Sequence, residues 1–266
     1  MFFYSSIEPV YYLLPIIGFV VGLLGTMLGG GGGFIFLPLL TLVVGAPAQT
    51  AVITSLVATL PICLVGAVAH FRKGNVSLRT GMLFSLVGVV GAFSGAAIAG
   101  YISASQLKIA FGVYSVVIAL NIFFDTLRKR RNELKGEPIG NSMVKNISVR
   151  GAFFGFFAGV ITGTFGTSGT APVLAGLFSM RMALKMVIGT SLMIVLVNTF
   201  FAIGAHFLLG QIDLTLVFFL TGGSAIGAII GPLILSGSQR IEKKENNIRY
   251  GYAVVMVLLG ILMITG

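Results

Sequence analysis

Seven stretches of this sequence are apolar over lengths that approach a complete bilayer crossing. They cover residues 10–28, 51–69, 83–102, 109–124, 192–209, 214–235 and 252–264. A helix needs about 20 apolar residues to cross the hydrocarbon core of a membrane. The strands of a transmembrane barrel would instead alternate polar and apolar residues, and no such alternation is present. We therefore expect an all-α polytopic membrane protein, with the lipid bilayer as its surroundings.

The composition agrees with this class and argues against others. Only 9% of the 266 residues are charged, whereas a soluble domain carries about 25%. The net charge of +10 comes mainly from short loops, where basic residues orient membrane proteins, so no nucleic-acid partner is expected. The chain has one cysteine, which excludes an intrachain disulfide and a cysteine metal site. Cys63 is expected to be a small buried side chain, and neither a metal nor a cofactor is expected.

The two halves of the chain repeat each other at an offset of about 137 residues, which becomes 136 after a one-residue gap. The matched pairs include Gly18/Gly155, Gly22/Gly159, Gly29/Gly166, Gly32/Gly169, Thr54/Thr190, Ser55/Ser191, His70/His206, Gly91/Gly227 and Gly95/Gly231. A register shared by both histidines and both Thr-Ser pairs is unlike a chance alignment of glycines. The predicted organisation is a first transmembrane repeat (1–127), a basic linker (128–150) and a second transmembrane repeat (151–266).

Each repeat is expected to contain a glycine-broken pair of segments followed by three crossings. In the first repeat the pair is 11–28 and 34–44, and the crossings are 49–70, 78–101 and 106–127. In the second repeat the pair is 151–165 and 171–179, and the crossings are 183–208, 214–235 and 247–265. The second members are short for a crossing, which favours re-entrant hairpins. Two tilted complete crossings remain the alternative.

Loop charges predict that the two repeats have opposite orientations. By the positive-inside rule, the basic linker is cytoplasmic. Arg72, Lys73 and Arg79 mark another cytoplasmic loop, whereas the equivalent loop around Gly210 has no Lys or Arg. Equivalent loops therefore lie on opposite sides, as in an inverted repeat, and both chain ends are expected outside.

The glycine-rich breaks are the predicted functional site. Residues 25–40 read "GTMLGGGGGFIFLPLL", and each glycine costs a helix about 1 kcal/mol relative to alanine. Irregular backbone at membrane depth is tolerated only where protein buries it or where it lines a polar cavity. Transporters with inverted repeats bind their substrate at such helix breaks. The first break and its counterpart "GTFGTSGTAP", residues 163–172, are therefore expected to meet at a ligand.

The side chains available at membrane depth favour an anion. All seven acids fall at predicted helix ends or in loops, and a cation carrier would usually place a carboxylate inside a span. Backbone N–H groups, hydroxyls and helix N-termini attract anions, although backbone carbonyls could still hold a cation. The predicted substrate-binding residues are Thr26, Gly29, Gly30, Gly31, Gly32, Gly33, Thr54, Ser55, Gly166, Thr167, Ser168, Gly169, Thr170, Thr190, Ser191 and Asn198.

His70 and His206 are the only histidines and occupy equivalent positions near helix ends. Histidine titrates near neutral pH, so the two could couple transport to protons or contact the anion. Placement at a helix end or at the membrane interface is the simpler interpretation of both.

The motif "GFVVGLLGTMLGGGGGFIFLPLL", its degenerate second copy and the basic central loop resemble the TauE/SafE family of sulfite and organosulfonate exporters. The resemblance covers essentially the whole chain. It implies export of sulfite or a small sulfonate such as sulfoacetate across the cell membrane of a bacterium or archaeon. The second copy has Thr-Ser in place of Gly-Gly, so the two half-sites are chemically unequal.

The leading hypothesis is a secondary anion carrier with alternating access, driven by proton coupling or by the membrane potential. An anion channel, or a carrier of another small anion, is the alternative. An enzyme is not expected: Ser168 and His206 are formally available to an intramembrane serine protease, but the hydroxyl-rich break has a simpler interpretation as a binding site. A scaffold would not explain the paired breaks. Lipid-facing glycine patterns are compatible with a homodimer.

Overall fold

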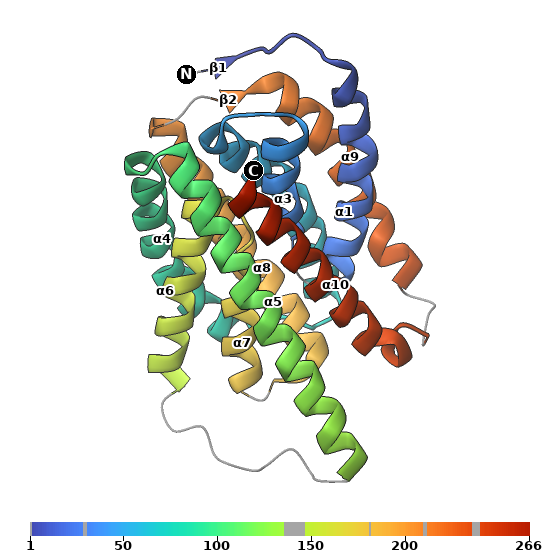
Figure 1. Cartoon of the computed structure of the whole chain (residues 1–266). Coiled ribbons are helices and arrows are strands. Elements are labelled where there is room, and N and C mark those ends of the chain that lie inside the picture. Colours follow the sequence, from blue (N-terminus) through green and yellow to red (C-terminus); the bar gives the residue numbers. More distant parts are fainter. Residues whose placement is uncertain (1, 29–30, 136–146, 181, 210–211, 236–239) are drawn as a thin grey trace.

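The computed structural model describes residues 2–28, 31–135, 147–180, 182–209, 212–235 and 240–266 of this all-α polytopic membrane protein. Figure 1 shows a bundle of helices, six of which in these residues are long and apolar enough to cross a membrane. The helices are α1 (Leu14–Leu28), α2 (Gly33–Pro38), α3 (Ala48–Arg72), α4 (Leu78–Tyr101), α5 (Ala104–Lys135), α6 (Ile147–Phe165), α7 (Thr170–Ser179), α8 (Leu184–Leu209), α9 (Leu214–Leu235) and α10 (Arg240–Thr265).

The bounds of α4 and α9 are those expected from the sequence, whereas three helices extend beyond their apolar segments. α5 continues to Lys135, α6 begins at Ile147 and α10 begins at Arg240. Hydropathy marks the part of a helix that lies in the membrane, but Lys, Arg and Glu are also good helix formers in water. The helical part of the chain therefore reaches into the segment expected as a linker.

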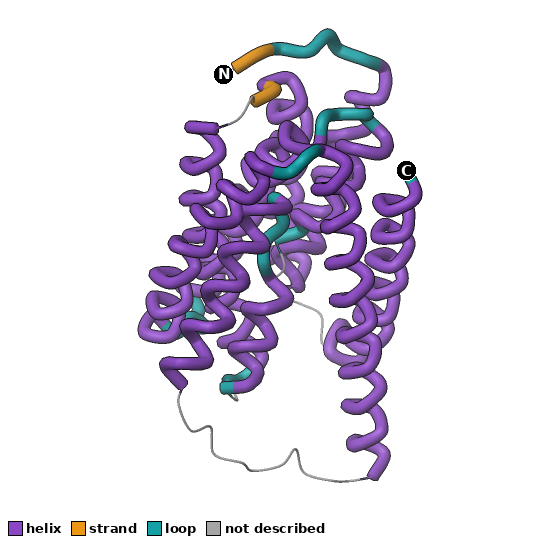
Figure 2. The backbone as a smooth tube through the Cα atoms, turned by 60° about the vertical axis from the view of Figure 1, so that its left-hand side comes forward, coloured by secondary structure: helices purple, strands orange, loops and turns teal. Residues whose placement is uncertain are grey.

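Both glycine-broken pairs form, and their second members are short. After a 3₁₀ turn at Pro9–Leu13, α1 ends at Leu28, and α2 is followed by a π-helical turn at Leu39–Val43. In the second repeat, α7 has 10 residues. At about 1.5 Å per residue, neither second member is as long as the hydrocarbon core is thick. Figure 2 shows short loops within the bundle, away from both of its ends.

The two halves interlock through small residues. α1 packs along α9, and α6 packs along α4. A Cβ built on Gly18 would lie 2.5 Å from the carbonyl oxygen of Leu220, and one built on Gly155 would lie 2.6 Å from that of Phe84. Because Gly155 is the repeat equivalent of Gly18 and Leu220 that of Phe84, one contact occurs twice. These glycines therefore allow close packing of α1 against α9 and of α6 against α4.

The equivalent helices run in opposite directions. In Figure 1, α1 descends from the end of the bundle that carries β1, and α6 rises toward it. α5 descends and α10 rises in the same way, so the C-terminal end of α10 lies toward the same end of the bundle as β1. Opposite directions of equivalent helices are what an inverted repeat requires.

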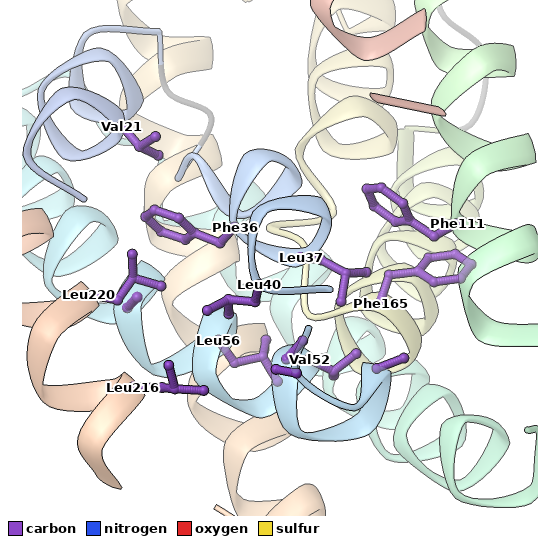
Figure 3. Close-up of a cluster of buried hydrophobic side chains, with 14 of the residues drawn as sticks. Val21, Phe36, Leu37, Leu40, Val52, Leu56, Phe111, Phe165, Leu216 and Leu220 are labelled. Carbon is purple, nitrogen blue, oxygen red and sulfur yellow. The ribbon is translucent and has the colours of Figure 1, made fainter. Parts of the chain in front are cut away.

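The first broken pair is held in the largest core cluster. Phe36, Leu37 and Leu40 of α2 and its following turn are completely buried. Figure 3 shows them among side chains from the surrounding helices, including Val21 of α1 and Leu56 of α3. Val173 and Leu177 of α7, the repeat equivalents of Phe36 and Leu40, are buried in a second cluster that also contains Phe84 of α4. Burial of these apolar faces holds each short helix, and hence each break, in place.

A short N-terminal strap was not expected from the sequence. β1 (Phe2–Phe3) pairs in parallel with β2 (Ile212–Asp213), which precedes α9. The carboxylate of Asp213 accepts hydrogen bonds from the backbone N–H groups of Thr215 at 3.0 Å and Ser5 at 3.3 Å. Asp213 therefore caps α9 and holds the start of the first half against the second.

Candidate functional site

The two breaks adopt backbone conformations that favour glycine. Gly31 and Gly32 have φ angles of 61° and 72°, and Gly166 and Gly169 have φ angles of 64° and 53°. These values lie in the left-handed region, which side chains with a Cβ rarely adopt. Gly32 and Gly169 directly precede α2 and α7, at equivalent positions of the two repeats. Gly29 and Gly30, also predicted to bind substrate, lie outside the described residues.

The two breaks contact each other inside the bundle. A Cβ built on Gly33 would lie 3.0 Å from the carbonyl oxygen of Gly166 and 3.1 Å from the backbone nitrogen of Ser168. One built on Gly31 would lie 2.9 Å from the Cβ of Ser168. Segments more than 130 residues apart in the sequence therefore meet, as expected for the two halves of one site.

Helix α3 forms a polar surface behind this contact. The hydroxyl of Ser55 donates to the carbonyl oxygen of Gly166 at 3.0 Å and lies 2.8 Å from that of Val52. A Cβ built on Gly31 would lie 3.1 Å both from Sγ of Cys63 and from Cγ2 of Thr59. Cys63 is buried, as expected, but its position against the first break was not. The small volume of the Cys63 side chain allows the close approach of Gly31. This packing role could not be recognised from the sequence, where cysteine is considered for its reactivity.

Replacement of Ser55 by alanine tests the link between α3 and the second break. The change removes a buried hydrogen bond, so we expect a loss of about 1 kcal/mol in the free energy of unfolding. Ser94→Ala is the matched control, because the Ser94 hydroxyl bonds the Val90 carbonyl of its own helix in an exposed position. Thermal unfolding in detergent measures both variants. Equal melting temperatures would contradict the structural importance of the Ser55 bond.

A small cavity of about 20 Å³ adjoins the second break. It is lined by the start of α7 and the residues before it, including Thr167 and Ser168. Phe34, Tyr114, Ile118 and Met256 of α2, α5 and α10 also line it. These four residues were not predicted from the sequence, because an apolar side chain in a span has the same sequence pattern whether it faces a site, a core or lipid.

The hydroxyls at the second break are buried. The hydroxyl of Thr170 lies 2.6 Å from that of Ser168, and α7 begins at Thr170. The Thr167 hydroxyl is buried without a hydrogen-bond partner among the described residues. The partial positive charge of a helix N-terminus and these hydroxyls together suit a negatively charged group.

Four other predicted hydroxyls are placed differently: two bond their own helix, one bonds a loop and one is buried. Thr26 bonds carbonyls of α1, and Ser191 donates to the carbonyl of Ile188 in α8 at 2.8 Å. Thr190 accepts from the backbone N–H of Ser77 at 2.9 Å and so supports the loop between α3 and α4. Thr54 is buried, and its hydroxyl has no partner in the described part of the chain.

Asn198 is completely buried in α8 and packs against Gly88 of α4. A Cβ built on Gly88 would lie 2.7 Å from Nδ2 of Asn198, so a larger residue would displace the amide. Within the described chain, neither the amide nitrogen nor its oxygen has a hydrogen-bond partner. Asn198 therefore offers both a donor and an acceptor in the interior.

The two histidines have different surroundings. Nε2 of His206 lies 2.6 Å from the carbonyl oxygen of Gly163, in the last turn of α6. Carbonyls in the last turn of a helix lack partners within the helix, so His206 satisfies one of them. His70 lies in the last turn of α3 and is half-buried. The bond of His206 agrees with the simpler, structural interpretation of that residue.

The described part of the site contains no carboxylate and no basic side chain. Nor do the described residues contain a group of three His, Cys, Asp or Glu side chains that could hold a metal ion. The chemistry on offer is therefore hydroxyl and amide hydrogen bonding, backbone N–H groups and a helix N-terminus.

Comparison with known proteins gives the family. The family described as "Sulfite exporter TauE/SafE" matches residues 14–263. The chain belongs to this family. No solved structure matches it.

Similar curated proteins are named as transporters, and those described here come from bacteria and an archaeon. "Probable membrane transporter protein YdhB" of Bacillus subtilis is 27% identical over 82% of this chain and 88% of its own length. A "Probable membrane transporter protein" of Xylella fastidiosa strain 9a5c is 29% identical over 93% of this chain and 91% of its own. "Probable membrane transporter protein MJ0441" of Methanocaldococcus jannaschii is 28% identical over 61% of each chain. As a TauE/SafE protein with helices long enough to span a bilayer, this chain is a multi-pass membrane transporter.

Proposed function

We propose that this TauE/SafE protein is a secondary transporter that exports a small sulfur oxyanion or organosulfonate by alternating access. The observation that carries the proposal is the contact between the two breaks, where Gly31 and Gly33 meet Gly166 and Ser168 in the interior. Helix breaks at membrane depth bind substrate in transporters built from paired repeats. The family's description as sulfite exporters supports the choice of a sulfur compound.

The groups around the breaks support an anion. The second break presents Thr167 and Ser168 just before α7 and Thr170 as its first residue, and the N-terminus of this 10-residue helix carries partial positive charge. The described residues that line the cavity include no carboxylate, which a cation carrier would usually place inside a span. The first break is followed by only six residues of α-helix, so we assign the negative charge of the substrate to the second break.

Alternating access requires two halves that can move relative to each other around the site. The opposite directions of α1 and α6 in Figure 1, and the equivalent contacts of Gly18 and Gly155, support an inverted repeat. We propose that the repeats rock against each other and open the breaks to one side at a time. If the protein forms a homodimer, the two repeats of each protomer would still move relative to each other within that protomer.

The proposed orientation places the chain in a prokaryotic plasma membrane with the central basic segment in the cytoplasm. Arg72, Lys73 and Arg79 lie at the α3–α4 loop, which would then also be cytoplasmic by the positive-inside rule. Both chain ends would lie outside. In this orientation the membrane potential favours exit of the anion, and the driving force is either this potential or proton coupling through a histidine.

Binding and flux with the full-length purified chain test the proposal. A ligand at 100 times its dissociation constant should raise the free energy of unfolding by about 2.7 kcal/mol. We expect this stabilisation with sulfite or sulfoacetate but not with taurine, acetate or chloride. Ser168→Ala should reduce it, whereas Ser94→Ala should not. In proteoliposomes, saturable flux with counterflow supports a carrier, and unsaturable flux proportional to the gradient supports a channel. Stabilisation by cations or neutral solutes, with none by any anion, would overturn the proposal.

A further inference from the structure

The last turn of α6, directly before the second break, is held by a side chain from another helix. If α6 continued, the carbonyl of Gly163 would accept a hydrogen bond from the backbone N–H of Thr167. α6 ends at Phe165, however, and Gly166 turns the chain with a φ angle of 64°. No backbone bond joins Thr167 to Gly163 in the described residues. The Gly163 carbonyl oxygen instead lies 2.6 Å from Nε2 of His206 in α8, so an imidazole replaces the backbone donor.

Burial makes this bond a strong constraint on the end of α6. His206 is only 5% exposed and Gly163 is buried, and a buried carbonyl without a donor is costly. Because a carbonyl oxygen only accepts hydrogen bonds, the proton of this bond must be on Nε2 of the imidazole. Both the neutral ring and the protonated ring can supply it. Without His206, the carbonyl would compete for the next donor in helical register, which is the N–H of Thr167.

Two contacts hold the same turn of α6 against α4. The hydroxyl of Thr164 donates to the carbonyl oxygen of Gly95 at 3.2 Å. A Cβ built on Gly163 would collide with the carbonyl oxygen of Ala92. A shift of this turn would disturb both contacts and the bond to His206, so α4 and α8 together fix where the second break begins.

The first repeat does not have this arrangement. The repeat equivalents of His206 and Gly163 are His70 and Thr26. The Thr26 hydroxyl bonds carbonyls of its own helix, and in the described part of the chain no hydrogen bond joins Thr26 to His70. A Cβ built on Gly189 of α8 would lie 2.8 Å from the Cβ of His70, which places His70 against a different helix. The histidine that ends a helix at a break is therefore a property of the second repeat.

The His206 bond favours an anion at the second break in two ways. The last carbonyls of α6 carry partial negative charge, and an imidazole N–H on one of them offsets part of it. The bond also occupies the carbonyl that would otherwise engage the Thr167 N–H. The break then keeps this backbone donor for a ligand.

We propose that His206 is a positioning residue for the substrate, whose Nε2–H ends α6 at the second break and keeps the Thr167 N–H available to the bound anion. This inference rests on the proposed function, because it takes the second break to be the anion site. It gives the two histidines different roles, and it assigns no proton transfer to His206.

The kinetics of anion efflux from proteoliposomes test the inference with the full-length chain. His206→Leu should raise the half-saturating concentration of sulfite or sulfoacetate about fivefold, the factor for one hydrogen bond, and leave the maximal rate nearly unchanged. His206→Gln should restore the half-saturating concentration, because its amide can donate to the same carbonyl. His70→Leu, the control at the equivalent position, should change neither quantity. A loss of folded protein would instead lower the maximal rate alone.

The position of the proton can be observed directly, even if His206→Leu fails to fold. The chain has two histidines, so His70→Gln contains a single imidazole. Nitrogen-15 spectra of labelled histidine distinguish a protonated Nε2 from an unprotonated one. We expect a proton on Nε2 of His206 at neutral pH. An unprotonated Nε2 would overturn the inference.

The outcomes separate this inference from the proposed function. If the unmodified protein transports no anion, both are wrong. If it transports an anion but His206→Gln is as impaired as His206→Leu, or neither changes the half-saturating concentration, only the inference is wrong. Loss of proton-driven transport in His206→Gln with unchanged anion affinity would show that His206 carries a proton, and this result would also overturn the inference.

Discussion

Gly33→Val is expected to reduce anion efflux at least tenfold per folded molecule. The new Cβ would lie 3.0 Å from the carbonyl oxygen of Gly166 and 3.1 Å from both the backbone nitrogen of Ser168 and the Cα of Thr167. All three atoms belong to the backbone, so no change of rotamer relieves the crowding and the two breaks must separate. Overpacking of this kind costs about 1–3 kcal/mol. Efflux from proteoliposomes, normalised to folded protein, is the measurement.

Gly100→Val is the matched control for Gly33→Val. Gly100 is exposed near the end of α4, and a Cβ built there meets nothing within 4 Å. Flux through this variant should equal that of the unmodified protein. Unchanged flux through Gly33→Val would mean that close contact between the breaks is not needed for transport, and the site would have to lie elsewhere.

Gly159→Val and Gly22→Val are each expected to lower the free energy of unfolding by about 3 kcal/mol or more. A Cβ on Gly159 would collide with the carbonyl oxygen of Gly88, and one on Gly22 with that of Ser224. These pairs are repeat equivalents, one at the α6–α4 contact and one at the α1–α9 contact. Rigid helix backbones meet at both points, so the helices must separate. Thermal unfolding and the yield of monodisperse protein measure the loss.

Gly204→Val and Gly222→Val provide the comparison for these two variants. Both glycines are exposed within long helices, and a Cβ at either meets nothing within 4 Å. Each variant should remain within about 1 kcal/mol of the unmodified protein, the range of ordinary helix propensities. If the exposed and buried glycines prove equally sensitive, helix propensity and not interhelical contact explains the glycine pattern.

The helix bounds were predicted well where the apolar segment and the helix end at the same residues. α4 and α9 have the expected bounds, because turn-forming or polar residues follow their apolar segments directly. α5 and α10 extend further, because their charged ends remain helical outside the apolar segment. The N-terminal strap was not predicted, because each of its two strands has only two residues and so leaves no periodic pattern in the sequence. Its anchor, Asp213, was recognised only as an acid outside the spans.

The candidate site was predicted in part. The break positions follow from glycine content, and the structure places Gly31 and Gly33 against the second break. The partners of the hydroxyls could not be predicted: Ser55 bonds the second break, whereas Thr190 bonds the loop at Ser77. The sequence shows that a hydroxyl can donate a hydrogen bond, but it does not show which atom accepts it.

The sequence by itself determined that this protein is a helical membrane protein, and it predicted two related halves with helix breaks at equivalent positions. Hydropathy, glycine content and internal similarity are properties of short segments, and they can be read without knowledge of contacts. Only the tertiary structure decided that α1 pairs with α9 and α6 with α4, that the two breaks touch, and that Tyr114 and Met256 face one of them. These contacts join residues far apart in the chain, and they depend on which surfaces fit closely when all the helices pack at once.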